Sequence, residues 1–223
     1  FDITGHATAD STLTGSDAGD TLTGVAGDDT LSGGVGNDTL EGANGDDTLI
    51  GGTGNDDLFG AAGANTLTGG EGNDIFNLVT GGTATITDFA TGDDIDTTAL
   101  TVTQGGTAQT ALTTAAAGGK ATVASNTWVA TTANENGNGV IVVTDQAAAD
   151  WNDAGTVIGA ALTVDGTAGN NGKFVIIIDN GTDTRVYYYS DVTNGFAAGD
   201  DLTLLGTVSG KEVADFAAGD FAP

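Results

Sequence analysis

The sequence of 223 residues contains no cysteine and no methionine, and it has a single histidine. Without cysteine the chain can form neither a disulfide nor a zinc–thiolate site. Because no second histidine is present, a zinc centre or a catalytic base at His6 is a poor hypothesis. The lack of cysteine also fits an extracellular protein that is exported unfolded.

Basic residues are scarce as well, with four Lys and Arg against 31 Asp and Glu, for a formal net charge of −27. Nucleic acids and anionic lipids bind positively charged surfaces, so partners of these two classes are excluded. No apolar run is long enough to insert into a membrane, and the N-terminus does not read as a signal peptide. Since the chain starts at Phe1 without a methionine, we expect a fragment or processed product whose export address lies elsewhere.

Glutamate is rare among the acidic residues, which are otherwise all aspartate; the glutamates are Glu41, Glu71, Glu135 and Glu212. Aspartate has a short side chain that favours tight turns. Hard cations bind oxygen ligands in such turns, and calcium is the most common of them. The bias towards aspartate therefore indicates carboxylates placed in loops to bind a cation.

Residues 6–77 repeat every nine residues, and the clearest unit is GGVGNDTLE at 33–41. Other units start at His6, Gly15, Gly24, Gly42, Gly51, Gly60 and Gly69. The sixth position is occupied by Ser11, Asp20, Asp29, Asp38, Asp47, Asp56, Asn65 and Asp74. The eighth is occupied by Leu13, Leu22, Leu31, Leu40, Leu49, Leu58, Leu67 and Phe76. A set of unrelated solvated turns does not explain so strict a period, so we favour metal binding.

Each unit predicts one turn and one strand. The first six residues are turn formers, with glycine where a positive φ is needed, and the last three form a strand whose central residue points inward. Two units then complete one coil of a parallel β-roll with a thin leucine core. We therefore predict a mainly all-β protein, in which this roll precedes a small, mixed and mostly antiparallel β domain with one helix.

The predicted roll is weak without a cation. One leucine per nine residues does not offset the backbone entropy of so many glycines. Sixth-position residues two units apart stack about 4.8 Å from one another, and two carboxylates at that distance repel by roughly 3 kcal/mol at an effective dielectric near 20. We therefore expect residues 6–77 to fold only with cations between the turns.

The repeat resembles the RTX (repeats-in-toxin) family, whose nonapeptide is G-G-x-G-x-D-x-U-x, where U is a large apolar residue. The resemblance implies calcium as the cofactor, held by sixth-position side chains and by turn carbonyl groups of stacked units. The implied side-chain ligands are Asp20, Asp29, Asp38, Asp47, Asp56, Asp74 and, more weakly, Asn65. The implied carbonyl ligands belong to Gly15, Asp17, Gly24, Gly27, Gly33, Gly34, Gly36, Gly42, Gly45, Gly51 and Gly54.

Four pairs of stacked units carry two aspartates: Asp20 with Asp38, Asp29 with Asp47, Asp38 with Asp56, and Asp56 with Asp74. The Asp47–Asn65 pair is weakened by its amide, and the Ser11–Asp29 pair is weaker still. We expect about five or six calcium ions, since calcium takes six to eight oxygen ligands and each site needs two turns. The fifth-position acids Asp10, Asp28 and Asp46 are expected to face solvent.

We predict two domains, the roll with its closing segment in residues 1–97 and a β-rich domain in residues 98–223. Residues 84–96 resemble the segment that closes the rolls of serralysin-type proteins, which makes Asp88 a candidate last ligand. Short strands are expected near Val123 and at Trp128–Val129. Further strands are predicted at 140–143, 173–179, 185–190 and 202–208, with a hairpin turn at Asn180–Gly181 and a helix at 145–162.

The pattern favours a structural and export module of a secreted, extracellular bacterial protein over an enzyme, because no catalytic constellation is present. The resemblance implies type I secretion machinery as a partner, a secretion signal near the C-terminus, and a surface-layer (S-layer) parent that self-associates in a lattice. The alternative is the accessory tail of a secreted enzyme such as a metalloprotease or lipase. A third hypothesis, an adhesin or ice-binding module, rests on the seventh-position threonines Thr12, Thr30, Thr48 and Thr66, although the β-propensity of threonine explains them equally well.

Overall fold

The computed structural model describes residues 1–97, 102–104, 107–109, 121–124, 140–144, 173–179, 182–190, 201–211, 215–216 and 221–222. Its regular elements are β-strands. The chain divides into two compact units. The first comprises Phe1–Ala99, Leu205–Gly210 and Gly219–Ala222, and the second comprises Leu100–Leu204, Lys211–Ala218 and Pro223. Within the residues just given, no helix is long and apolar enough to cross a membrane.

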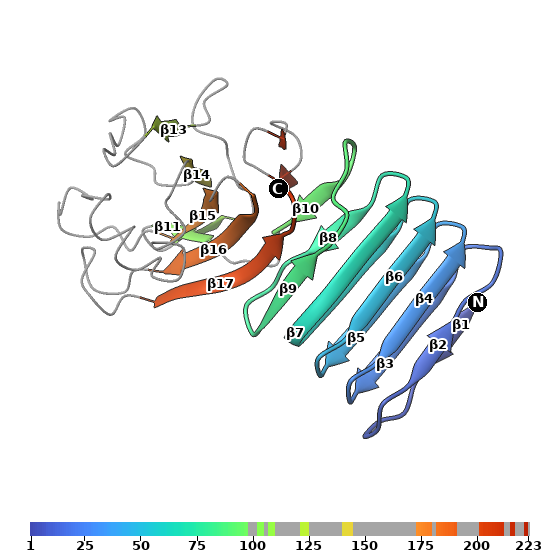
Figure 1. The fold of residues 1–223 in the computed structure, drawn as a ribbon. Helices are drawn as coiled ribbons and strands as arrows, with labels where there is room; N and C mark the ends of the chain where they lie inside the picture. The colour runs from blue at the N-terminus through green and yellow to red at the C-terminus, as the bar shows by residue number, and fades with distance from the viewer. Residues whose placement is uncertain are drawn as a thin grey trace. The chain divides into compact units, whose positions relative to one another are not determined.

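The first unit is a parallel β-roll of two facing sheets (Figure 1), as the repeat predicts. One sheet contains β1 (Asp2–Thr4), β3 (Thr21–Ala26), β5 (Thr39–Asn44), the start of β7 (Asp57–Glu71), β8 (Ile75–Asn77), β10 (Asp94–Asp96) and β18 (Phe221–Ala222). The other contains β2 (Thr12–Thr14), β4 (Thr30–Val35), β6 (Thr48–Thr53), the end of β7, β9 (Gly82–Ile86) and the end of β17 (Asp201–Val208).

Within the repeats, each strand residue pairs with the residue 18 positions later, as Leu22 does with Leu40 and Leu31 with Leu49. One coil is therefore two nonapeptides. The two segments that return from later in the chain extend the same parallel pairing, because Gly206–Val208 pairs with Ala84–Ile86 and Phe221 pairs with Ile95. These late strands lie beyond the residue 97 at which the sequence-based division ended the roll.

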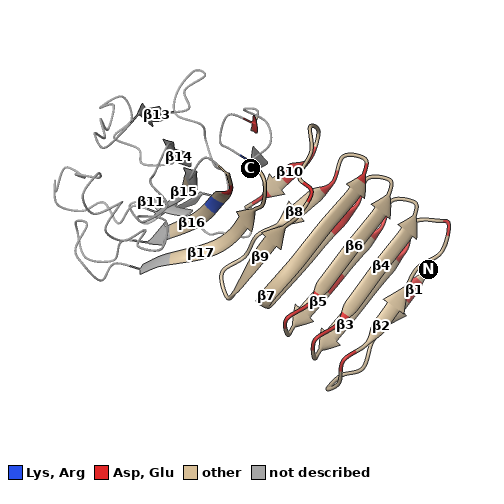
Figure 2. Ribbon diagram, in the orientation of Figure 1, with Lys and Arg blue, Asp and Glu red and all other residues tan. Residues whose placement is uncertain are grey.

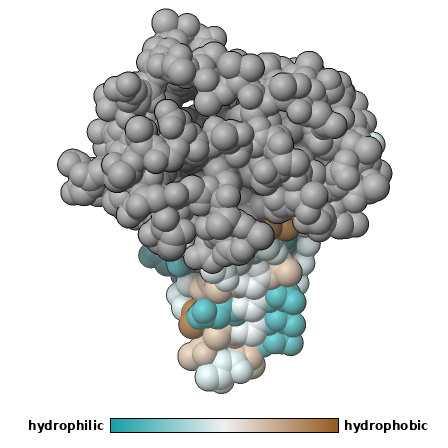
Figure 3. Space-filling model, turned by 90° about the vertical axis from the view of Figure 1, so that its left-hand side faces the viewer, coloured by the Kyte–Doolittle hydropathy of each residue, from teal (hydrophilic) through white to brown (hydrophobic). Residues whose placement is uncertain are grey.

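Eighth-position side chains from the two facing sheets form the core of the repeats, as predicted, except that Leu13 in the first unit is only half-buried. Leu22, Leu31, Leu40, Leu49, Leu58, Leu67 and Phe76 are all completely buried. Ile86, Ile95 and Val208 are equally buried and continue the core beyond the repeats. Few large apolar side chains lie outside the core, and the visible surface of the roll is mostly hydrophilic or neutral (Figure 3). Each strand of the repeats consequently contributes one large apolar side chain to the core.

The turns lie along two edges of the roll, and the two edges differ in chemistry. The Asp20 edge consists of the turns at 15–20, 33–38, 51–56 and 69–74, three of which read GGxGND. The Asp29 edge consists of the turns at 6–11, 24–29, 42–47 and 60–65, where the second position is Val25, Ala43 or Ala61 in the last three. Acidic residues concentrate at these edges rather than on the strand faces (Figure 2).

Second-position residues adopt a positive φ on both edges. On the Asp20 edge Gly34, Gly52 and Gly70 do so at 106° to 119°, which glycine tolerates. On the Asp29 edge the same conformation falls on Val25 (φ 90°), Ala43 (φ 76°) and Ala61 (φ 63°). A β-branched residue in this region is a genuine outlier. The Asp29 edge is therefore the strained one.

The second unit contains β11 (Val102–Gln104), β12 (Thr107–Gln109), β13 (Ala121–Ala124), β14 (Val140–Thr144), β15 (Lys173–Asp179) and β16 (Thr184–Ser190). β15 and β16 form the predicted antiparallel pair. The pairing is less antiparallel than we expected, because β13, β14 and β15 run parallel to one another. The stretches between them are long enough for the crossover that parallel strands require. The predicted helix at 145–162, the strand at 128–129 and the turn at 180–181 lie outside the described residues.

Candidate metal centre

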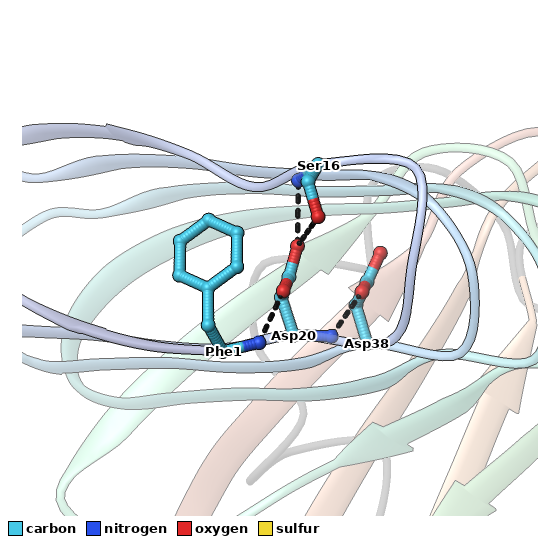
Figure 4. Close-up of polar contacts among 4 residues, drawn as sticks. All are labelled: Phe1, Ser16, Asp20 and Asp38. Carbon is cyan, nitrogen blue, oxygen red and sulfur yellow. Dashed lines mark hydrogen bonds and ion pairs between the residues drawn. The ribbon is translucent and has the colours of Figure 1, made fainter.

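The sixth-position side chains form an inner ladder along each edge. Asp20, Asp29, Asp38, Asp47, Asp56 and Asp74 are between 1% and 3% exposed, although they are carboxylates. In each coil the main-chain N–H of one sixth residue donates to Oδ1 of the sixth residue 18 positions later. The N···O distance is 2.7 Å from Asp20 to Asp38 (Figure 4) and 2.8 Å from Asp38 to Asp56. Each of these hydrogen bonds therefore holds Oδ1 in place and fixes the orientation of the second oxygen, Oδ2.

The second oxygen, Oδ2, has no hydrogen-bond partner in five of these buried carboxylates: Asp29, Asp38, Asp47, Asp56 and Asp74. A buried carboxylate oxygen without a partner is costly, and in proteins such a group is paired or binds a metal. At Asp20 the equivalent oxygen accepts hydrogen bonds from the N–H and Oγ of Ser16, at 2.6 and 3.0 Å (Figure 4). Five of the six predicted aspartates thus present an oxygen that is available to a cation.

Each of these oxygens lies over the first-position glycine of its own unit. A Cβ built on Gly33 would collide with Asp38 Oδ2 and would lie 2.7 Å from the carbonyl oxygen of Gly51. The same two kinds of oxygen surround Gly24 and, one coil further, Gly51. The first-position glycine is therefore needed to leave a cradle in which a carboxylate oxygen and a carbonyl oxygen converge.

Carbonyl oxygens of the turns must complete such a site, because no three Asp, Glu or His side chains come together as a metal-binding group in the described part of the chain. The second- and fourth-position carbonyls of Gly34 and Gly36 point along the stack, towards Gly52 and Gly54. Third-position carbonyls are already engaged, since Gly36 N–H donates to Thr53 O at 2.8 Å. Two carboxylates with carbonyl oxygens match the hard oxygen ligands that calcium prefers. The residues therefore fit the ion, and the individual carbonyl ligands stay predictions.

The fifth-position residues form a second, outer ladder that the sequence did not reveal. Asp10, Asp28 and Asp46 are exposed, as expected. Their Oδ1 atoms nevertheless accept main-chain hydrogen bonds, from Asp28 N–H to Asp10 and from Asp46 N–H to Asp28, each at 2.9 Å. Asn37 and Asn55 do the same on the Asp20 edge at 3.0 Å. These side chains tie neighbouring coils together without a metal.

The closing segment adds a sixth-position residue that sequence reasoning missed. Asp93 is 2% exposed and accepts the N–H of Asp74 at Oδ1, at 3.0 Å. It lies 19 rather than 18 residues after Asp74, which conceals it from a nine-residue count, but the spacing Asp-x-Ile to Ile95 repeats the Asp-x-Leu of the units. Asp88, the predicted last ligand, accepts the N–H groups of Gly69 and Gly70 at 2.9 Å, one at each carboxylate oxygen, and its role as a ligand stays a prediction.

Comparison with known families identifies the repeat. Residues 14–49 and 50–81 match the family model of the RTX calcium-binding nonapeptide repeat (HemolysinCabind). These residues are RTX repeats. No curated protein matches the chain. Among solved structures, the chain is similar to the AlgE6R3 subunit from the Azotobacter vinelandii mannuronan C5-epimerase, with 19% identity over 97% of this chain and 80% of that chain and a TM-score of 0.38.

RTX repeats bind calcium, and the unpartnered Oδ2 atoms stay its predicted ligands. One RTX turn departs from the pattern. Asn65 Oδ1 accepts the N–H of Asp47 at 2.9 Å, so its amide nitrogen must face the cradle. Nδ2 lies beside Gly60 and donates to the carbonyl oxygen of Ala61 at 3.3 Å. An N–H2 group is not a metal ligand. The weakness predicted for an Asn in this position therefore has a geometric cause, and the side chain of Asn65 finds its hydrogen-bond partners without an ion.

The buried RTX carboxylates have altered acidities. Burial raises the pKa of Asp56 from 3.8 to about 6, and the nearby charges of Asp74 and Asp38 act in the same direction. Burial likewise raises the pKa of Asp47 and of Asp74 above the ordinary value. Without a cation these groups therefore resist ionisation in the folded roll.

This shift predicts how the calcium-free roll responds to pH. A carboxyl whose pKa is higher in the folded than in the unfolded state stabilises the fold most below its unfolded pKa of 3.8, and this contribution is lost as the pH rises through about 6 at Asp56. In chelator, more of the strand signal of the roll should therefore be retained near pH 5 than near pH 7.5, and circular dichroism can measure the difference. A strand signal that increases between pH 5 and pH 7.5 in chelator would contradict this prediction. Asp56→Asn should reduce the pH dependence of the strand signal.

Proposed function

We propose that this chain is the calcium-dependent folding and structural part of a secreted bacterial surface protein, and that it also contributes to export. The observation that carries the proposal is the row of buried carboxylates whose Oδ2 atoms have no partner. Such a row destabilises the fold until cations fill it, because each isolated buried charge is costly. Removing calcium is the direct test, and it should unfold residues 6–77.

The physiological logic follows from calcium supply. In the cytosol calcium is scarce, so the repeats would stay unfolded and fit for threading through an exporter. Outside the cell millimolar calcium would fold them, and the free energy of binding would become free energy of folding. In this proposal the ion is bound by the chain's own Asp side chains and turn carbonyls, and no catalytic step is assigned to the chain.

The export half of the proposal places a type I secretion signal near the C-terminus. Fused behind a passenger protein in a host with a type I exporter, residues 98–223 should direct secretion. Deleting about the last 60 residues should abolish it, where the length is an order-of-magnitude value from the family resemblance. Secretion of the passenger into the medium is measured by immunoblot, with an intracellular marker as the control for lysis.

A deletion that leaves export intact would remove the secretory half of the proposal and would leave the C-terminal part as a lattice-contact domain. The matched control is Asp28→Ala in a second fusion, which carries the full chain behind the same passenger, since Asp28 is exposed and lies in the outer ladder. This variant should be secreted normally, because its C-terminal part is unchanged and its calcium midpoint shifts little.

We propose that the parent is an S-layer protein, which self-associates in a surface lattice. The accessory tail of a secreted metalloprotease or lipase is the alternative. The sequence of the parent protein before Phe1 distinguishes them, because an H-E-x-x-H motif there would identify a metalloprotease. An ordered two-dimensional array formed in calcium by the parent protein would instead support the lattice.

One surface favours a second candidate function, adhesion or ice binding. The seventh-position threonines Thr12, Thr30, Thr48 and Thr66 are in register along one sheet. Thr85 and Thr207 extend the same row beyond the repeats. A regular row of hydroxyl and methyl groups suits a crystalline surface such as ice. Thermal hysteresis of the calcium-loaded chain tests it, and its absence would remove this candidate.

A further inference from the structure

Asn44 is the one asparagine that is followed by glycine in residues 1–97. It is the third residue of the turn at 42–47 on the Asp29 edge, and it is exposed. Asparagine is a chemically labile residue, and it is most reactive before glycine, which has no Cβ to keep its main-chain nitrogen away from the preceding side chain. The turn at 42–47 therefore contains two neighbouring residues that can react with each other.

The reaction needs only water. The main-chain nitrogen of Gly45 gives its proton to solvent and bonds to Cγ of Asn44, and the side-chain amide leaves as ammonia. Water then opens the resulting cyclic imide, a succinimide, at either of its carbonyl carbons. The product at position 44 is an ordinary aspartate or an isoaspartate, in which the main chain runs through the side-chain methylene and carboxyl carbon. The isoaspartate lengthens the main chain of the turn.

The folded roll keeps the two reacting groups apart. Gly45 N–H donates to the carbonyl oxygen of Ala62 at 3.2 Å, and the carbonyl oxygen of Asn44 accepts Gly27 N–H at 3.0 Å. The amide nitrogen of Asn44 donates to the carbonyl oxygen of Val25 at 3.4 Å. Gly45 is also tightly packed, because a Cβ built on it would collide with the carbonyl oxygen of Gly27. The attacking nitrogen is thus bonded to the next coil, and the main chain around it has no room to rotate.

This protection depends on the neighbouring coils. Asn44 pairs with Ala26 in the coil before it and with Ala62 in the coil after it. Each hydrogen bond of Asn44 and Gly45 described above joins two coils, so all of them are lost when the repeats unfold. A reaction that requires such an opening is slowed in proportion to the rarity of the open state. Whatever folds the repeats should therefore suppress the reaction.

We propose that Asn44–Gly45 is a site of spontaneous covalent modification, which is open in the calcium-free chain and closed by folding. This inference rests on the proposed calcium-dependent folding of the repeats. Isoaspartate at position 44 would displace the carbonyl group that accepts Gly27 N–H. It would also lengthen one turn in a stack where each strand residue pairs with the residue 18 positions later. A chain that waits without calcium thus loses, irreversibly, the ability to build the Asp29 edge correctly.

The first test incubates the full chain in chelator and, in parallel, in millimolar calcium at mildly alkaline pH. Proteolytic digestion and mass spectrometry give the fraction converted at Asn44, and peptide fragmentation distinguishes isoaspartate from aspartate. Asn37 and Asn55 are internal controls, because both are exposed in turns of the roll but are followed by aspartate, whose side chain hinders the attack. A synthetic peptide of residues 39–48, which has no coil to pair with, shows whether calcium acts on the chemistry itself.

We expect conversion at Asn44 to be at least about tenfold slower in calcium than in chelator, which corresponds to an opening free energy of about 1.4 kcal/mol. The peptide should convert at the same rate in both. Equal rates at Asn44, in a chain whose circular dichroism shows folding by calcium, would overturn the inference. Conversion of Asn37 as fast as that of Asn44, or slowing of the peptide by calcium, would also overturn it. Failure of calcium to fold the chain would instead refute the proposed function on which the inference rests.

The second test measures what the modification does to folding. Asn44→Ala removes the reacting amide, and the fold accepts alanine at this position, because Ala26 and Ala62 occupy it in the two neighbouring turns of the same edge. After incubation in chelator, added calcium should restore less strand signal to the wild type than to Asn44→Ala, whereas the freshly prepared proteins should respond alike. Equal recovery of the two incubated proteins would overturn the predicted loss of the Asp29 edge.

Discussion

Excess chelator should abolish the strand signal of residues 6–77, and millimolar calcium should restore it. A core with one large apolar side chain per repeat is too small to stabilise the roll alone. Against it stand five buried carboxylate oxygens without partners. Stacked carboxylates about 4.8 Å apart also repel by roughly 3 kcal/mol per pair at an effective dielectric near 20. Calcium removes both costs at once.

Far-ultraviolet circular dichroism of the full chain measures the overall change, and hydrogen exchange locates it in the roll. Magnesium is the control cation, and it should restore little structure because it demands tighter octahedral geometry and retains its waters. An unchanged spectrum in chelator would contradict the proposal. Residues 98–223 should keep their strand signal in chelator, because the apolar runs between 140 and 208 can build a core without a metal.

Asp38→Ala should raise the calcium concentration at the folding midpoint by at least about tenfold, which corresponds to a loss of about 1.4 kcal/mol. Asp38 accepts the N–H of Asp20 at 2.7 Å, and its Oδ2 is unpartnered. It faces a stacked aspartate on both sides, Asp20 and Asp56, so its removal damages two sites. Calcium titrations followed by circular dichroism give the midpoint.

Asp28→Ala is the matched control. Asp28 also accepts one main-chain hydrogen bond from the next coil, from Asp46 N–H at 2.9 Å, but it lies in the exposed outer ladder. Loss of this exposed bond should cost about 0.5 kcal/mol, which moves the midpoint about twofold. The difference between the two variants therefore isolates the metal-facing oxygen. Equal shifts would mean that the inner and outer ladders are wrongly assigned.

The repeat made much of the roll predictable from sequence. A period of nine with fixed turn formers and one apolar position defines turn, strand and inward face together, and Leu22 to Leu67 are buried as that pattern requires. The burial of the Asp column follows from the same register, since the sixth residue lies two positions before the core residue and alternate strand positions share a face. Calcium binding at each turn stays a prediction for experiment.

Features without a local pattern could not be predicted. Gly206–Val208 and Phe221–Ala222 add strands to the two sheets of the roll. Nothing in their sequence indicates that their partner strands lie more than 100 residues away. Asp93 was missed because one added residue breaks the count, although its spacing to Ile95 was visible. The parallel pairing of β14 with β15 depends on a crossover between distant strands, which short apolar runs do not specify.

The difference between the two edges restricts how a roll of this kind can change length during evolution. Because turns of one kind recur every 18 residues, duplication or loss of a whole coil preserves both rows of aspartates. Gain or loss of a single nonapeptide would move every later turn to the opposite edge, joining GGxGND turns to the strained Val25 and Ala43 type. In a stack where each repeat contacts only its neighbours, that fault would persist to the closed end. The unit that can be duplicated or lost without disturbing either edge is therefore the pair of repeats.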